Sequence, residues 1–112
     1  MISGAHLMIF TCDEAADRAF LRDVLEIPCI DSGGGWLIFK LPPTEMGVHG
    51  GEKNDVHQLY FMCDDLDAEI SRLSDKGVCC SDPFTASWGR ATGVPLPGGG
   101  KIGLYEPRHA RP

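Results

Sequence analysis

Two residues that can bind a metal or orient a polar ligand stand at equivalent places in a repeated sequence. His6 opens one apolar run and Gln58 opens another, and each lies the same distance before an aspartate, Asp13 or Asp65. An imidazole can ligate a metal or share a proton, and an amide can donate and accept hydrogen bonds. The repeat predicts that these two side chains occupy matching positions in two copies of one module.

Strand alternation places further residues on the face of His6 and Gln58, because neighbouring side chains in a strand point in opposite directions. The residues of this face are His6, Met8 and Phe10; Gly47 and His49; Gln58, Tyr60 and Met62; and Lys101, Gly103 and Tyr105. The alternate residues of these segments, which point to the other face, are all apolar: Leu7, Ile9, Leu59, Phe61, Ile102 and Leu104. The apolar parity indicates a face covered by helices. The mixed parity indicates a ligand cavity, a polar sheet surface or a dimer contact.

The elements that position these residues follow the same order twice. In the first half, a strand over residues 4–11 precedes a helix that starts after Asp13, and CIDSGG, GWLIFKL and TEMGVHG are predicted as three further strands. In the second half, a strand over residues 56–63 precedes a helix that starts after Asp65, followed by VCCSDPF, WGRATGV and KIGLYEP. The sequence predicts one α+β domain, residues 1–112, with βαβββ modules at residues 1–52 and 53–112.

Composition narrows the functional classes. The chain has 43% hydrophobic residues and a net charge of −6, which opposes nucleic-acid binding. No run approaches the roughly 20 apolar residues of a membrane span, and the first residues lack the basic start of a secretion signal. The five cysteines have no CxxC spacing and are interpreted as reduced thiols. We therefore expect a cytoplasmic protein without nucleic-acid or membrane partners.

Three segments resemble a known superfamily. They are the run from His6 to Ile27, the segment DDLDAEISRLSDKGV, and the closing WGRATGVPLPGGGKIGLYEP. Together they are similar to the glyoxalase / bleomycin-resistance / extradiol-dioxygenase proteins, also called vicinal oxygen chelate proteins. The resemblance covers almost the whole chain. It implies that the two modules form a curved mixed sheet, or cup, with helices on its outer face, commonly in a homodimer that builds two such cups.

Metal-using members of that superfamily typically take one ligand from the first and last strand of each module. Carried over to this chain, the four positions are His6, Gly47, Gln58 and Gly103. The two glycines stand where the family has carboxylates, and a divalent metal needs at least three protein ligands. The resemblance therefore implies a degenerate site with no metal or other cofactor, unless a neighbour such as His49 rescues one.

Three functions are consistent with these residues. In the first, the chain binds a hydrophobic or aromatic small molecule, as antibiotic-sequestering members do. The contacts would come from His6, Met8, Phe10, His49, Gln58, Tyr60, Trp88, Arg90 and Tyr105. Arg90 is included because a guanidinium recognises carboxylate or phosphate groups. The alternatives are a metal-dependent lyase, isomerase or dioxygenase of the same superfamily, and a dimeric interaction module without a ligand.

The remaining reactive side chains are predicted to lie outside the site. Cys63 stands near the start of the second helix and is expected in the core rather than as a nucleophile. His57 and Glu106 have the parity opposite to that of the cup. His109 belongs to a short tail and is expected to be solvated.

Overall fold

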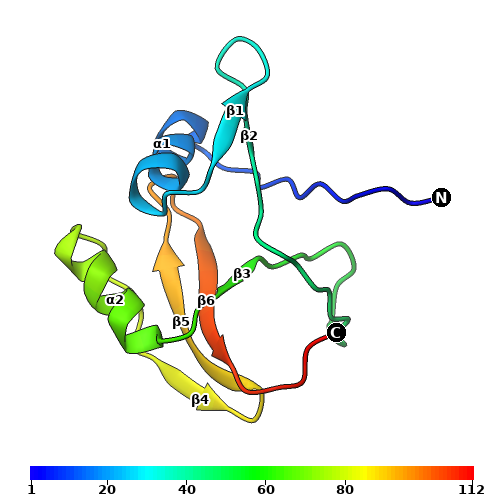
Figure 1. Cartoon of the computed structure of the whole chain (residues 1–112), viewed down its shortest axis with the longest axis vertical. Helices are drawn as coiled ribbons and strands as arrows, with labels where there is room; N and C mark the ends of the chain where they lie inside the picture. Colours follow the sequence, from blue (N-terminus) through cyan, green and yellow to red (C-terminus); the bar gives the residue numbers. More distant parts are fainter.

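The computed structural model describes all residues from Met1 to Pro112, and its strands form two separate sheets. The elements in chain order are α1 (Glu14–Ala19), the π-helix η1 (Phe20–Val24), β1 (Cys29–Asp31), β2 (Leu37–Phe39), β3 (Tyr60–Met62), α2 (Leu66–Asp75), β4 (Phe84–Ala86), β5 (Gly89–Pro95) and β6 (Lys101–Pro107). β1 and β2 form an antiparallel hairpin, and the other strands form a mixed sheet in the order β3-β6-β5-β4 (Figure 1).

The second half has the predicted order of strand, helix and three strands. β3 is parallel to β6, so the first strand of this module lies beside its last one, with Tyr60 opposite Gly103. β5 is antiparallel to both β4 and β6. The prediction of a βαβββ unit is confirmed here, although β3 is shorter than predicted and β4 shares only Phe84 with VCCSDPF, the segment predicted for it.

The first half is less regular than predicted. Residues 4–11 and 44–50 form no strand, and no backbone hydrogen bond joins residues 1–10 to any other segment. Leu7 and Ile9, predicted to lie under helices, are 39% and 38% exposed. These predictions were wrong because alternation shows only that a segment could be a strand, whereas a strand also needs a neighbour to pair with its N–H and C=O groups.

Both helices begin at the predicted aspartates. A side-chain oxygen of Asp13 accepts a hydrogen bond from the backbone N–H of Ala16, and Asp65 accepts one from Ala68, each at 3.1 Å. Such N-caps satisfy donors that have no partner within the helix. The first helix widens into η1 and ends at Val24, shortly before Glu26, whose φ of 57° is left-handed.

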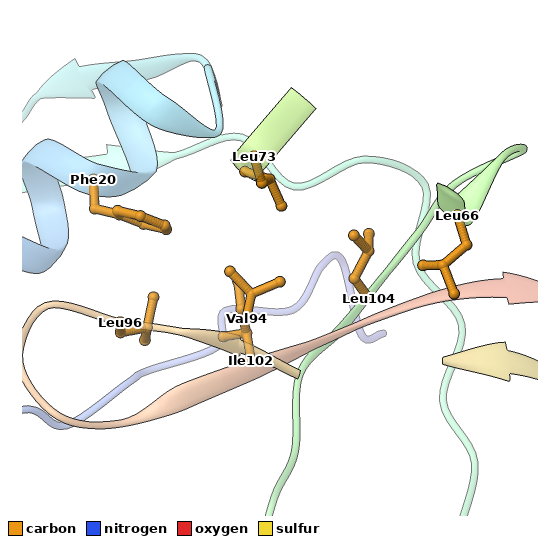
Figure 2. Close-up of a cluster of buried hydrophobic side chains, with 7 residues drawn as sticks. All are labelled: Phe20, Leu66, Leu73, Val94, Leu96, Ile102 and Leu104. Atoms are coloured by element: carbon orange, nitrogen blue, oxygen red, sulfur yellow. The ribbon is translucent and has the colours of Figure 1, made fainter. Parts of the chain in front are cut away.

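One hydrophobic core joins the helices to the second sheet. Its seven buried members are Phe20, Leu66, Leu73, Val94, Leu96, Ile102 and Leu104. Both helices lie on the same side of β5 and β6 (Figure 1), and their side chains meet those of the strands in the space between (Figure 2). Leu59 and Phe61 pack against this cluster and are partly buried. The face predicted to be covered by helices is therefore confirmed for the second module.

Hydrogen bonds connect the first helix to the second half of the chain. The backbone N–H of Gly98, in the turn between β5 and β6, donates to the buried carboxylate of Asp17 at 2.7 Å. Arg72 of α2 donates to the carbonyl oxygen of Val24 at 3.3 Å. The two halves thus share one core on one sheet. No helix of the structure has the length and apolar character that crossing a membrane requires.

We expect Leu73→Ala to lower the free energy of unfolding by about 2–5 kcal/mol, because it removes a buried side chain and leaves a cavity. Leu73 is 1% exposed, whereas Ile30 is 68% exposed, so Ile30→Ala serves as the control and should change stability by less than about 0.5 kcal/mol. Urea unfolding followed by circular dichroism measures both. Equal losses for the two variants would contradict this description of the core.

Candidate functional site

Four aromatic rings gather on the sheet face opposite the helices, which we call the open face. They are Tyr60, Phe84, Trp88 and Tyr105 and are referred to below as the aromatic cluster. Trp88 and Tyr105 have ring centroids 5.5 Å apart, and Tyr60 and Tyr105 are 5.9 Å apart, with the rings close to perpendicular. This edge-to-face arrangement is favourable for aromatic pairs. Tyr105 is buried beneath the others, while Tyr60, Phe84 and Trp88 keep exposed ring surface.

Two glycines face each other across neighbouring strands of the open face. Gly93 of β5 lies directly opposite Gly103 of β6 in the antiparallel register. A hollow of about 490 Å³ lies at these glycines and is walled by Tyr60 and Phe84. Because both residues lack a Cβ, neighbouring side chains can pack close to the backbone there; a Cβ added to Gly93 would lie 3.1 Å from Oγ of Ser81.

Tyr60 occupies the space above Gly103. A Cβ added to Gly103 would overlap the ring of Tyr60, whereas one added to Gly47 would meet nothing within 4 Å. The position to which the resemblance assigns the second-module carboxylate is therefore covered by an aromatic ring. The glycine at 103 makes this packing possible.

Several residues predicted to bind a ligand come together. Met8, Phe10, Gln58 and Tyr60 line the hollow, and Tyr60, Trp88 and Tyr105 belong to the aromatic cluster. Residues 7–10 reach the hollow without being paired as a strand. The segment therefore contributes to the wall of the site through its side chains alone.

Three other predicted contact residues lie elsewhere. His6 is exposed and does not line the hollow. His49 is also exposed, and its ring nitrogen bonds to the carbonyl oxygen of Gly50. Arg90 forms an ion pair with Asp67 of α2 at 2.9 Å. Arg90 thus points to the helix side of the sheet, away from the open face.

Sequence reasoning missed several lining residues as ligand contacts, among them His57, Ser81, Phe84 and Lys101. His57 was assigned to the wrong face. It precedes the first residue of β3, Tyr60, so the alternation of side chains along the strand does not apply to it. Lys101 shares the parity of Gly103, and that signal could have found it. The assignment of Glu106 to the helix side is confirmed, since its carboxylate accepts a hydrogen bond at 3.0 Å from the N–H of Leu66 in the first turn of α2.

The donor atoms of the site do not fit a divalent metal. No three His, Cys, Asp or Glu residues lie close enough together to bind one ion. Among the four positions taken over from the superfamily, Gly47 and Gly103 have no side-chain donor. Such a site lacks the negative charge that offsets removal of a divalent ion from water.

Cys63 is a poor candidate for a nucleophile. Burial, together with the nearby carboxylates of Glu69 and Glu106, raises the pKa of its thiol to about 11. Near neutral pH the group is therefore a thiol, which is far less nucleophilic than a thiolate. Its sulfur donates to the carbonyl oxygen of Tyr105 at 3.6 Å.

His109 joins the aromatic cluster to an acidic residue; it is exposed, as predicted for the tail, but it also makes specific contacts. Its ring stacks on Tyr105 with an interplanar angle of 23°. Its Nε2 lies 3.0 Å from the hydroxyl of Tyr105 and 3.6 Å from a carboxylate oxygen of Glu45. Burial raises the pKa of the Tyr105 hydroxyl, and this hydroxyl shares with His109 a hydrogen bond whose direction depends on the tautomer of the ring.

The architecture and length of the chain match those of several solved structures. TnmS3, an antibiotic binding protein from Streptomyces sp. CB03234, is 22% identical with a TM-score of 0.64, over 96% of this chain and 99% of that one. Lactoylglutathione lyase from Agrobacterium tumefaciens is 18% identical with a TM-score of 0.66, over 93% and 92% of the two chains. A member of the glyoxalase/bleomycin resistance protein/dioxygenase superfamily from Sphaerobacter thermophilus is 20% identical with a TM-score of 0.66, over 94% and 98%.

The chain has the fold of this superfamily. The fold expected from the sequence motifs is thereby confirmed, and it extends over nearly the whole chain. Neither a protein-family model nor a curated protein matches the sequence. Function must accordingly be argued from the site itself, because one fold hosts many activities.

We expect Gly103→Ala to destabilise the protein by about 1–3 kcal/mol, because the new methyl group would collide with the ring of Tyr60. In a Tyr60→Ala background the same change should cost much less, since the obstructing ring is gone. Gly47→Ala is the control, because the space around Gly47 is open. Thermal unfolding of the four variants measures the coupling. Additive costs would show that Tyr60 does not depend on Gly103.

Proposed function

We propose that the protein binds a hydrophobic or aromatic small molecule on the open face of its sheet, without a metal ion. The observation that carries the proposal is the hollow of about 490 Å³ over the Gly93–Gly103 pair, next to the aromatic cluster. Its volume lies in the range of small-molecule sites, roughly 300–1,000 Å³. The hollow therefore has room for a ligand of drug-like size.

The lining suits a flat, largely apolar ligand. Tyr60 and Phe84 are 39% and 51% exposed and present ring surface that a planar molecule could cover. Met8 and Phe10 add apolar surface from the N-terminal segment. Gln58 and Lys101, together with Asp55, His57, Ser81 and Thr92 of the lining, are polar groups that could orient a ligand by hydrogen bonds.

Metal independence is part of the proposal. It is supported by residue type, because Gly47 and Gly103 provide no donor, and by the ring of Tyr60, which covers Gly103. The similar protein TnmS3 is described as an antibiotic binding protein, and binding without chemistry is the role we propose for this chain.

We expect 2-naphthamide, a planar and uncharged probe, to quench tryptophan fluorescence on binding, and Trp88→Leu to weaken binding by roughly fivefold to tenfold. Trp36→Leu is the matched control, because Trp36 lies outside the aromatic cluster and packs under Arg18. Added EDTA should change neither the affinity nor the melting temperature. Loss of a stoichiometric metal together with a lower melting temperature would refute metal independence, and absence of saturable binding would refute the site.

We also propose that the protein is a homodimer, because a single chain leaves too much surface exposed. Its accessible surface is 8367 Å² for a mass of 12.1 kDa, whereas a compact monomer of this mass exposes about 6,000 Å². The difference, about 2,300 Å², is comparable to what each subunit buries in a large obligate dimer. Phe10, 92% exposed, and the unpaired backbone of residues 4–10 offer a surface that a second copy could cover.

We expect light scattering at micromolar concentration to give the mass of two chains. Phe10→Asp should shift the protein toward the monomer, because a charge would replace an apolar contact. Ser71→Asp, on the exposed side of α2, adds the same charge elsewhere and should leave the dimer intact. A monomeric wild-type protein with unchanged folding would contradict the proposal.

A further inference from the structure

A carboxylate of the chain itself lies in an anion site at the edge of the aromatic cluster. One oxygen of Glu45 is 3.3 Å from Nε of Arg111, and the other is 3.6 Å from Nε2 of His109. His109 also shares a hydrogen bond with the hydroxyl of Tyr105. The side chain of Glu45 is only 19% exposed, so these groups enclose it.

The segment that supplies Glu45 has few other attachments. Residues 41–58 make no backbone hydrogen bond with any other part of the chain. The contact of Glu45 with Arg111 is the one side-chain hydrogen bond that joins this segment to another. The C-terminal tail and this segment lie side by side in Figure 1. An external carboxylate could therefore replace Glu45 without breaking a backbone hydrogen bond.

The anion site adjoins ring surface that can bind an aromatic group. His109 stacks on Tyr105 with centroids 5.9 Å apart, and the ring of Tyr105 packs against both Trp88 and Tyr60. Trp88 and Tyr60 keep 37% and 39% of their surface exposed. Tyr60 also lines the hollow, so its contact with Tyr105, and that of Tyr105 with His109, connects the hollow to the anion site.

We infer that the ligand is an aromatic carboxylic acid whose carboxylate displaces that of Glu45 from Arg111 and His109. This inference rests on the proposed binding function and names the class of ligand. A guanidinium binds a carboxylate through charge-assisted hydrogen bonds, while a neutral amide cannot compete with Glu45 for it. The net charge of −6 gives an anion no general attraction, so selectivity for an acid must come from local cations. Arg90 is not available for this role, because Asp67 holds it on the other face.

The test compares 2-naphthoate with its uncharged analogue 2-naphthamide. Glu45→Gln should tighten binding of the acid by about fivefold, because it removes a competing carboxylate from an ion pair near the surface. The same variant should leave the affinity for the amide unchanged. Arg111→Gln should weaken binding of the acid by about tenfold and should also leave the affinity for the amide unchanged. Titration calorimetry measures both, with folding checked by circular dichroism.

Matched variants separate the site from general charge. Glu52→Gln removes one negative charge from the same segment, and Arg108→Gln removes one positive charge from the same tail; neither side chain contacts Glu45. Both should leave the affinity for the acid within about twofold of the wild type. If Glu52→Gln tightens binding of the acid as much as Glu45→Gln does, the inference is overturned.

The two proposals fail in different ways. If acid and amide bind equally to the wild-type protein and to both site variants, the ligand-class inference is wrong while the proposed binding function stands. If neither probe binds to any variant, Glu45→Gln included, both are wrong. Glu45→Gln decides the outcome even if Arg111→Gln fails to fold.

Discussion

The pairing of β5 with β6 is the constraint on which both the core and the site depend. The two strands run antiparallel, from Gly89 opposite Pro107 to Pro95 opposite Lys101. Because side chains alternate, this one register directs Val94, Ile102 and Leu104 into the core and places Gly93, Gly103 and Tyr105 on the open face. A slip of one residue would exchange the two sets. Burial of the core residues therefore stabilises the register that also forms the floor of the hollow.

Within that register, glycine at 103 has two consequences. It removes the carboxylate expected of a metal-using member of the superfamily, and it lets the ring of Tyr60 lie on the sheet. The ring in turn packs against Tyr105 and Trp88. The absence of a side-chain donor at this position and the packing of an aromatic ring over it thus follow from one residue.

The first half of the chain depends on the second for its packing. Phe20 is buried in the core on the second sheet, and the carboxylate of Asp17 accepts a hydrogen bond from the backbone N–H of Gly98. The segments predicted as the outer strands of the first module remain unpaired, so their backbone groups face solvent in the single chain. The large exposed surface has the same origin, because a module whose strands lack neighbours cannot bury its apolar side chains.

The sequence by itself determined the features that depend on near neighbours along the chain. Asp13 and Asp65 cap helices through hydrogen bonds that span three residues. The alternation of side chains along β6 identified which of its residues face the core and the side on which Glu106 lies. The motifs also identified the fold. Each of these rests on a local rule, either capping or strand periodicity, that the order of residues expresses directly.

Only the tertiary structure decided which distant groups meet. It paired Arg90 with Asp67, stacked His109 on Tyr105, brought Glu45 to Arg111 and laid Tyr60 over Gly103. It also showed that alternation over residues 4–11 does not make a strand without a partner. The physical reason is common to all of them: ion pairs, ring contacts and strand pairing act between residues brought together in space, and the pattern along one segment does not contain the position of its partner.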